Sequence, residues 1–208
     1  MDRYSKIDSA LIIGLMMALI VSSIMAFGSR CEEIRGQVLR LHVLANSNSK
    51  ADQELKLGVR DAVLDATGDL FAAAGNLTEA EDAAKTNLAL IRQTAQEEII
   101  RRGSNDPVDV KLTRMFFETR VYENATLPAG YYDAVRITIG EAKGKNWWCV
   151  MFPPMCVQSA VKRTEDTQLT KEIQQLGERP DYKMAFAAVE LFESLRDKLT
   201  QAQEQVIA

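Results

Sequence analysis

The residues most capable of chemistry in this chain are its single histidine, His42, and two of its three cysteines, Cys149 and Cys156. A histidine base can activate a cysteine nucleophile when the two side chains are adjacent in space, whatever their separation in sequence. Asn46 could orient such a histidine, and the result would be an extracytoplasmic hydrolase acting on peptide or cell-wall substrates. A thiol with no cation or helix N-terminus beside it has no reason to be activated, so a structural role is the competing interpretation.

The remaining polar residues indicate no cofactor or metal site. Glu54, Asp61 and Asp65 lie along one predicted helix with lysine and arginine between them, which is typical of a solvated face. No glycine-rich phosphate loop follows a predicted strand, so nucleotide binding is not expected. The paired Cys/His spacings that a structural zinc ion needs do not occur. We therefore predict a protein that is not an enzyme and needs no cofactor, and we keep the Cys/His hydrolase as the alternative.

Composition and charge narrow the class of protein. The chain has 208 residues, of which 47% are hydrophobic and 26% charged, an ordinary globular composition. Its formal net charge is -4 and it contains no basic block. Nucleic acid is therefore excluded as an expected partner.

The N-terminus predicts export. Two basic residues precede an almost unbroken apolar run over residues 10–27, which is at the lower limit for spanning a bilayer. Residues 1–28 are then either a cleaved signal peptide, for which Ala26 and Gly28 supply small residues, or a retained single-span membrane anchor. Both readings leave residues 29–208 as an extracytoplasmic domain, secreted or membrane-anchored.

An oxidising compartment changes what the cysteines imply. Cys149 and Cys156 could form a disulfide that closes a short loop, and the chain-entropy model assigns such a bridge about 2.5 kcal/mol. Pro153 and Pro154 could fold the chain back far enough to bring the two thiols together. The alternative is two buried free cysteines, with Cys31 unpaired in either case.

Hydrophobic periodicity places these residues on secondary structure. A half-buried strand is expected over residues 37–45, and a helix over residues 50–67 begins at Ser49, with Asp52 three residues on. A second helix is expected over residues 78–102, where Thr78 and Glu81 have the spacing of a capping box.

The second half of the chain is predicted to form mainly strands. They are expected over residues 108–122, 131–139 and 147–152, with a turn at 127–130, and form two consecutive hairpins. Pro153 and Pro154 end the last strand. Residues 158–180 are expected to form a flexible connection, and residues 185–203 a closing helix. This order predicts an α+β domain with helices packed on one face of a largely antiparallel sheet.

Two blocks of sequence resemble a known family. Residues 39–63 read LRLHVLANSNSKADQELKLGVRDAV and residues 135–154 read VRITIGEAKGKNWWCVMFPP, and together they cover under a quarter of the chain. Their order and spacing, with the apolar N-terminus, resemble the stage II sporulation protein R family of endospore-forming bacteria. The resemblance implies a sporulation signalling protein, exported from the forespore into the space between the two membranes that separate it from the mother cell. Its implied partner is a membrane-embedded aspartic protease of the mother cell, which on activation processes the precursor of sigma factor E.

Both blocks carry polar and aromatic groups beyond what a core requires, and we interpret these as candidate receptor contacts. They are Asn46, Ser47, Arg60, Asp61, Lys145, Asn146, Trp147 and Trp148. In a regular strand one of the two adjacent tryptophans faces the core and the other faces out, and the outer one is the first candidate. The competing interpretation is structural, with Arg60 and Asp61 holding the helix to the sheet and Asn46 closing the strand exit.

Overall fold

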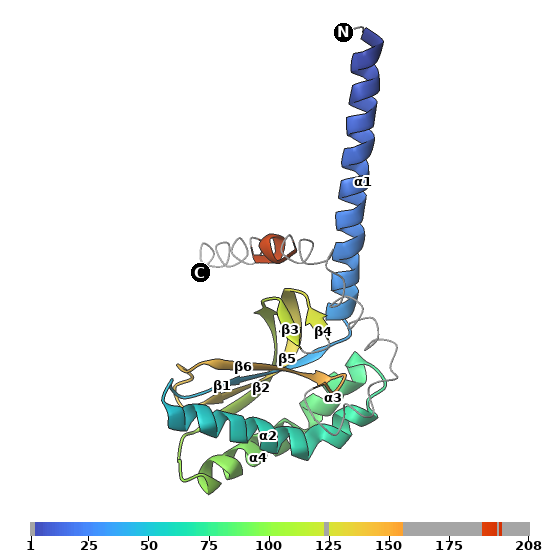
Figure 1. The fold of residues 1–208 in the computed structure, drawn as a ribbon. Coiled ribbons are helices and arrows are strands. Elements are labelled where there is room, and N and C mark those ends of the chain that lie inside the picture. The colour runs from blue at the N-terminus through green and yellow to red at the C-terminus, as the bar shows by residue number, and fades with distance from the viewer. Residues whose placement is uncertain (1–2, 123–124, 156–188, 195, 197–208) are drawn as a thin grey trace, which may run out of the picture.

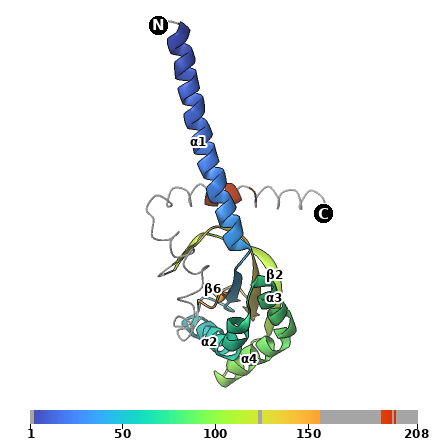
Figure 2. The same ribbon diagram turned by 90° about the vertical axis from the view of Figure 1, so that its right-hand side faces the viewer.

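The computed structural model describes residues 3–122, 125–155, 189–194 and 196, and it shows a layered domain from which one long helix projects (Figure 1). Helix α1 (Arg3–Arg35) leaves the domain on one side of a central sheet. Three further helices cover the opposite side, as the turned view shows (Figure 2). The domain is α+β, as the sequence predicts.

The central sheet has four strands in the order β2-β5-β1-β6. They are β1 (Leu39–Leu44), β2 (Val108–Phe117), β5 (Gly130–Ile139) and β6 (Asn146–Phe152). Strand β1 is parallel to β5 and antiparallel to β6, and β2 is antiparallel to β5, so the sheet is largely antiparallel. The predicted end of the last strand is confirmed, because β6 stops immediately before Pro153.

One of the two predicted hairpins is wrong. Strands β5 and β6 follow each other in sequence, but β1 lies between them and hydrogen-bonds to both. All six residues of β1 are buried, and such a strand needs a neighbour on each side to satisfy its backbone. The connection of residues 140–145 therefore passes over the end of β1.

The helical layer begins with α2 (Lys50–Ala73), whose start is as predicted. The side chain of Ser49 accepts a hydrogen bond from the backbone N–H of Asp52 at 3.1 Å. The helix runs beyond the predicted end at residue 67 and carries Phe71 into the core. An aromatic side chain one turn further on thus extends the apolar stripe of this helix.

The single helix predicted over residues 78–102 is instead two helices, α3 (Leu77–Thr86) and α4 (Leu88–Arg101). They meet at Asn87, whose side chain donates to the carbonyl of Ala83. The predicted capping box at Thr78 is also wrong, because Asn76 caps α3 by accepting from the N–H of Glu79. An asparagine side chain can hydrogen-bond to the free backbone groups at a helix end, which explains the break at Asn87 and the cap at Asn76.

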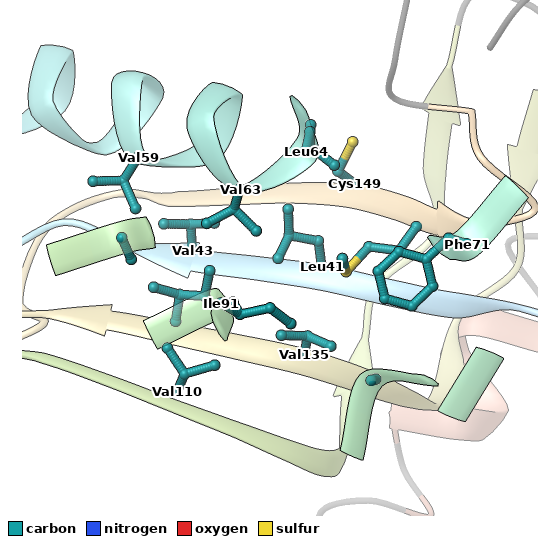
Figure 3. Close-up of a cluster of buried hydrophobic side chains, with 14 of the residues drawn as sticks. Leu41, Val43, Val59, Val63, Leu64, Phe71, Ile91, Val110, Val135 and Cys149 are labelled. Atoms are coloured by element: carbon teal, nitrogen blue, oxygen red, sulfur yellow. The ribbon is translucent and has the colours of Figure 1, made fainter. Parts of the chain in front are cut away.

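The main hydrophobic core lies between these helices and the sheet (Figure 3). Leu41 and Val43 project from β1 toward Val59 and Val63 of α2, and Ile91 of α4 packs beside them. This face of the sheet is called the helix-side face. Alternate residues of each strand point to the other face, here called the α1-side face.

A small two-stranded sheet lies on the α1-side face. Its strands are β3 (Arg120–Tyr122) and β4 (Ala125–Leu127), so the strand predicted over residues 108–122 is broken and the turn predicted from residue 127 begins later. Strand β5 starts at Gly130, whose positive φ of 145° suits glycine.

Helix α1 has two parts with different surroundings. Its apolar part makes it the one helix within the described residues that is long and apolar enough to cross a membrane, and no part of that apolar window is buried. Its last turns instead carry Phe27, Cys31 and Ile34 into a second hydrophobic cluster on the α1-side face. Arg35 donates to the carbonyl of Ala129 at 2.6 Å. The predicted boundary at residue 28 therefore falls inside one continuous helix, and whether the chain is cut there stays a prediction.

Two of the predictions lie largely beyond the described residues. The flexible connection of residues 158–180 lies wholly outside them. Of the closing helix predicted over residues 185–203, the structure describes residues 189–194 and 196, which are helical.

Candidate functional site

The two family-like blocks meet at one end of the sheet, at the left of Figure 1. There the β1–α2 loop (residues 45–49) lies against the β5–β6 connection (residues 140–145). These two loops and Asn146, the first residue of β6, are together called the tip. The backbone N–H of Lys143 donates to the carbonyl of Asn46 at 3.0 Å, and that of Gly144 to the carbonyl of Ala45 at 2.9 Å. Segments about a hundred residues apart in sequence thus form one hydrogen-bonded unit.

Asn46 joins three elements at the tip. Its side-chain oxygen accepts from the backbone N–H of Glu141 at 2.9 Å, and its amide donates to the carboxylate of Asp52 at 3.3 Å. The hydroxyl of Ser47 donates to the same carboxylate at 2.5 Å. These hydrogen bonds, that of Ser47 foremost, lower the pKa of Asp52 below its ordinary value. Asn46 and Ser47 therefore hold the loops to the first turn of α2.

Two glycines allow the loops to approach so closely. Gly140 has a φ of 56°, and a Cβ there would collide with the side chain of Asn46. A Cβ on Gly144 would collide with the carbonyl of Ser47, which is backbone and cannot move aside. The tip thus depends on the absence of side chains at these positions.

Arg60 and Trp147 form the aromatic part of the site. The guanidinium of Arg60, on α2, lies 4.2 Å from the ring centroid of Trp147, on β6. Arg60 also pairs with the carboxylate of Asp61 at 2.6 Å. One turn earlier, the buried Lys56 donates to the carbonyl of Lys145 at 3.0 Å. These contacts hold α2 to the edge strand while leaving Lys145, Asn146 and Asp61 exposed.

The adjacent tryptophans lie on opposite faces, as strand geometry predicts, but neither is fully exposed. Trp147 is half-buried on the helix-side face. Trp148 is half-buried on the α1-side face, where it stacks on His42 with ring centroids 3.9 Å apart and planes 1° from parallel. Both faces of β6 are partly covered, so neither tryptophan is the outward-facing, exposed residue that the sequence analysis expects.

His42 and Cys149 cannot act together. Cys149 pairs with Leu41 across the β1–β6 ladder and faces the helices, whereas His42 pairs with Trp148 and faces the α1 side. Burial lowers the pKa of His42 to about 4, so the imidazole is neutral near pH 7. Cys156 lies outside the described residues, and the predicted Cys149–Cys156 bridge stays a prediction.

A shallow depression of about 500 Å³ opens on the outer side of the tip. Its lining includes Asn46, Ser47, Gly140, Glu141 and Lys143. Three charged residues line it, Asp106, Glu141 and Lys143, of which Lys143 and Glu141 pair with each other at 2.7 Å and are both exposed. The surface that the tip offers to a partner is therefore polar and of mixed charge.

Known proteins match the region that contains this site. A family model described as stage II sporulation protein R matches residues 35–162, which is more than half of the chain. The chain belongs to the stage II sporulation protein R family. The stage II sporulation protein R of Bacillus subtilis (strain 168) is 38% identical over 144 residues, which cover 67% of this chain and 64% of that protein. The matched part thus spans less than two thirds of the relative's length, and no solved structure matches the chain.

Membership of the stage II sporulation protein R family confirms the resemblance stated from the two blocks and supports a sporulation-related role. The matched residues include the whole tip, all six strands and helices α2, α3 and α4, but only the last residue of α1.

Sequence reasoning missed two residues that complete this site, Asp52 and Lys56. Asp52 was placed only at the start of α2, although it receives the side chains of both Asn46 and Ser47. Lys56 is buried against the β5–β6 connection. A run of polar residues before a capped helix is a weak signal for Asp52, and nothing in the sequence distinguishes Lys56 from a solvated lysine.

Proposed function

We propose that this chain is an exported signalling protein that activates a membrane-embedded aspartic protease of the mother cell, leading to processing of the sigma factor E precursor. It would act from the space between the forespore and mother-cell membranes. Family membership supports the sporulation role. The main support for a receptor-contact site is that the two family-like blocks meet at one solvent-facing tip.

The tip suits recognition because its shape is held by the chain itself. Asn46 and Ser47 fix the two loops to α2, so little conformational entropy remains to be lost on binding. Arg60 and Trp147 add the residue types that most often anchor interfaces. The exposed Lys145 and Asn146 would supply polar contacts beside that anchor.

The proposal can be tested by co-producing this chain, the protease and the sigma factor E precursor in a bacterium that does not sporulate. Cleavage of the precursor is followed by immunoblot. Trp147→Ala and Trp148→Ala are compared separately, with folding checked by circular dichroism. Because Trp147 lies beside the tip and Trp148 stacks on His42 on the α1-side face, we expect Trp147→Ala to lose cleavage while its fold remains.

Arg60→Ala sharpens this test, with Arg92→Ala as its matched control. Both arginines lie on helices of the same layer and pair with a carboxylate, but Arg92 pairs with Asp109 of β2, the edge of the sheet opposite β6. We expect Arg60→Ala to reduce cleavage and Arg92→Ala to leave it unchanged. If both tryptophan variants lose cleavage only when they lose their fold, the tip is not the contact site. If the unaltered chain produces no cleavage at all, the proposed function itself is wrong.

A further inference from the structure

The described residues outside the apolar part of α1 expose few large hydrophobic side chains. They are Leu90, Ile100, Val121, Leu191 and Phe192. Leu90 and Ile100 belong to α4, on the far side of the domain from α1. Val121 of β3 is 78% exposed and Leu191 and Phe192 are each 63% exposed, and these three lie on the side from which α1 leaves.

The segment with Leu191 and Phe192 is fastened to the base of α1. Its Glu193 is buried and pairs with Arg35 at 3.2 Å, and its Val189 joins the second hydrophobic cluster. In both views this segment, drawn in red, lies crosswise to α1 near the domain (Figures 1 and 2). Its two apolar side chains are thus exposed next to the helix that has the length and composition to span a bilayer.

Cations gather on the same side of the molecule. A row across the α1-side face aligns Lys111 with Arg136 and Arg136 with His42. Arg40, in the same strand as His42, is fully buried with its guanidinium 4.1 Å from the ring centroid of Phe117. Within the described residues, Lys111, Arg136 and Arg40 have no acidic partner. Arg40 is interior, whereas the exposed Lys111 and the half-buried Arg136 keep unpaired positive charge at this face.

We propose that the chain keeps α1 in a bilayer and that the α1-side face rests against the surface of that same bilayer. Val121, Leu191 and Phe192 contact the boundary between headgroups and acyl chains, as apolar residues of interfacial helices do. Lys111 and Arg136 face anionic phospholipid headgroups.

The dimensions of α1 agree with this arrangement. Eight residues separate the end of its apolar part at Phe27 from Arg35, which corresponds to about 12 Å of helix. Strand β3 and the segment with Leu191 and Phe192 lie on the same side of the sheet as this stretch, and the cationic row projects from the sheet toward that side. Charges at such a separation from a membrane surface act within one or two Debye lengths. The continuity of α1 through Phe27 and Cys31, both buried in the domain, favours retention of the helix.

The test uses the full chain reconstituted into lipid nanodiscs, with a photo-crosslinking amino acid placed at residue 121 or 192. Residue 100 is the matched control, because Ile100 is 58% exposed on the opposite side of the domain. After illumination, lipid adducts are counted by mass spectrometry. We expect residues 121 and 192 to give severalfold more lipid adducts than residue 100. Equal yields at the three positions, or adducts with protein in place of lipid, would overturn the proposal.

The charge requirement is tested in the same assay with and without phosphatidylglycerol in a phosphatidylcholine nanodisc. We expect phosphatidylglycerol to raise adduct yield at residue 192, and Lys111→Gln with Arg136→Gln to remove that increase. Lys85→Gln is the control, since Lys85 is an exposed lysine of α3 on the helix-side layer. If the adduct yield of the unaltered chain is the same with and without phosphatidylglycerol, the proposed role of the cations is wrong. None of these readouts depends on the receptor.

Discussion

The polar groups of the tip and those of the α1-side face differ in how they are hydrogen-bonded. At the tip, Asn46, Ser47 and Asp52 exchange hydrogen bonds with one another and with loop backbone. On the α1-side face, two nitrogens of Arg40 and the Nε of Arg136 are buried without a hydrogen-bond partner. The difference indicates that the tip is shaped by its own polar contacts, whereas the α1-side face keeps its polar groups in place by aromatic packing.

The largest expected effect is at the tip, for Gly144→Ala. The added Cβ would collide with the carbonyl of Ser47 and separate the two loops. We expect the free energy of unfolding to fall by about 3 kcal/mol, as for other overpacked sites. Denaturant unfolding of the detergent-solubilised chain measures it. Gly68→Ala is the control, because no atom lies within 4 Å of its new Cβ, and it should not destabilise the protein.

The α1-side face should respond to pH through His42. Burial holds the pKa of folded His42 at about 4, below the ordinary 6.5, so the unfolded chain binds the proton first as pH falls. Stability is therefore lost progressively below pH 6.5, by about 2 kcal/mol at pH 5 relative to pH 8. His42→Phe, which keeps an aromatic ring against Trp148, should remove that part of the slope. An unchanged pH profile in this variant would contradict a buried, neutral His42.

Asn46→Ala tests how far the tip depends on side-chain hydrogen bonds. The change leaves the N–H of Glu141 and the carboxylate of Asp52 each with one partner fewer. We expect a loss of about 1.5 kcal/mol in the free energy of unfolding. Gln93→Ala serves as the control, since Gln93 donates only to Glu97 on the exposed surface of α4. Equal stability of these two variants would show that the tip is held by its backbone alone.

The smallest expected effect on stability is that of Arg60→Ala. A guanidinium stacked on one face of an indole at a partly exposed site contributes about 0.7 kcal/mol. Denaturant midpoints measured beside the Trp147→Ala variant and the double variant would give the coupling between the two residues. A coupling near zero would mean that Arg60 lies over Trp147 without stabilising the fold, and the pair would then be free to serve a partner.

Local patterns in the sequence predicted single elements well. The alternation of residues 37–45 predicted β1 as a strand, although the strand is fully buried and not half-buried, and Ser49 with Asp52 predicted the start of α2 at the correct residue. The predictions were wrong where one local pattern is compatible with two different structures. The apolar period over residues 78–102 continues across Asn87, so periodicity alone could not show that the chain breaks there.

The site was predicted in part. Seven of the eight candidate contacts lie at or beside the tip, and Trp148 lies on the other face. Whether they touch a receptor stays a prediction. Asn46 illustrates why the sequence could not decide its role. One of its partners, Glu141, is distant in sequence and the other, Asp52, is near, and only the folded structure shows that its side chain hydrogen-bonds to both.

The sequence by itself determined the apolar N-terminal helix, the α+β class and the family. Each depends on residue order within a short window, through helical or strand periodicity or through a block of matching residues. The tertiary structure alone decided that β1 separates β5 from β6, that His42 and Cys149 face opposite ways, and that α1 ends inside the domain. These outcomes depend on which buried strand needs two neighbours and on which surfaces can be covered together, and such requirements act between segments distant in sequence.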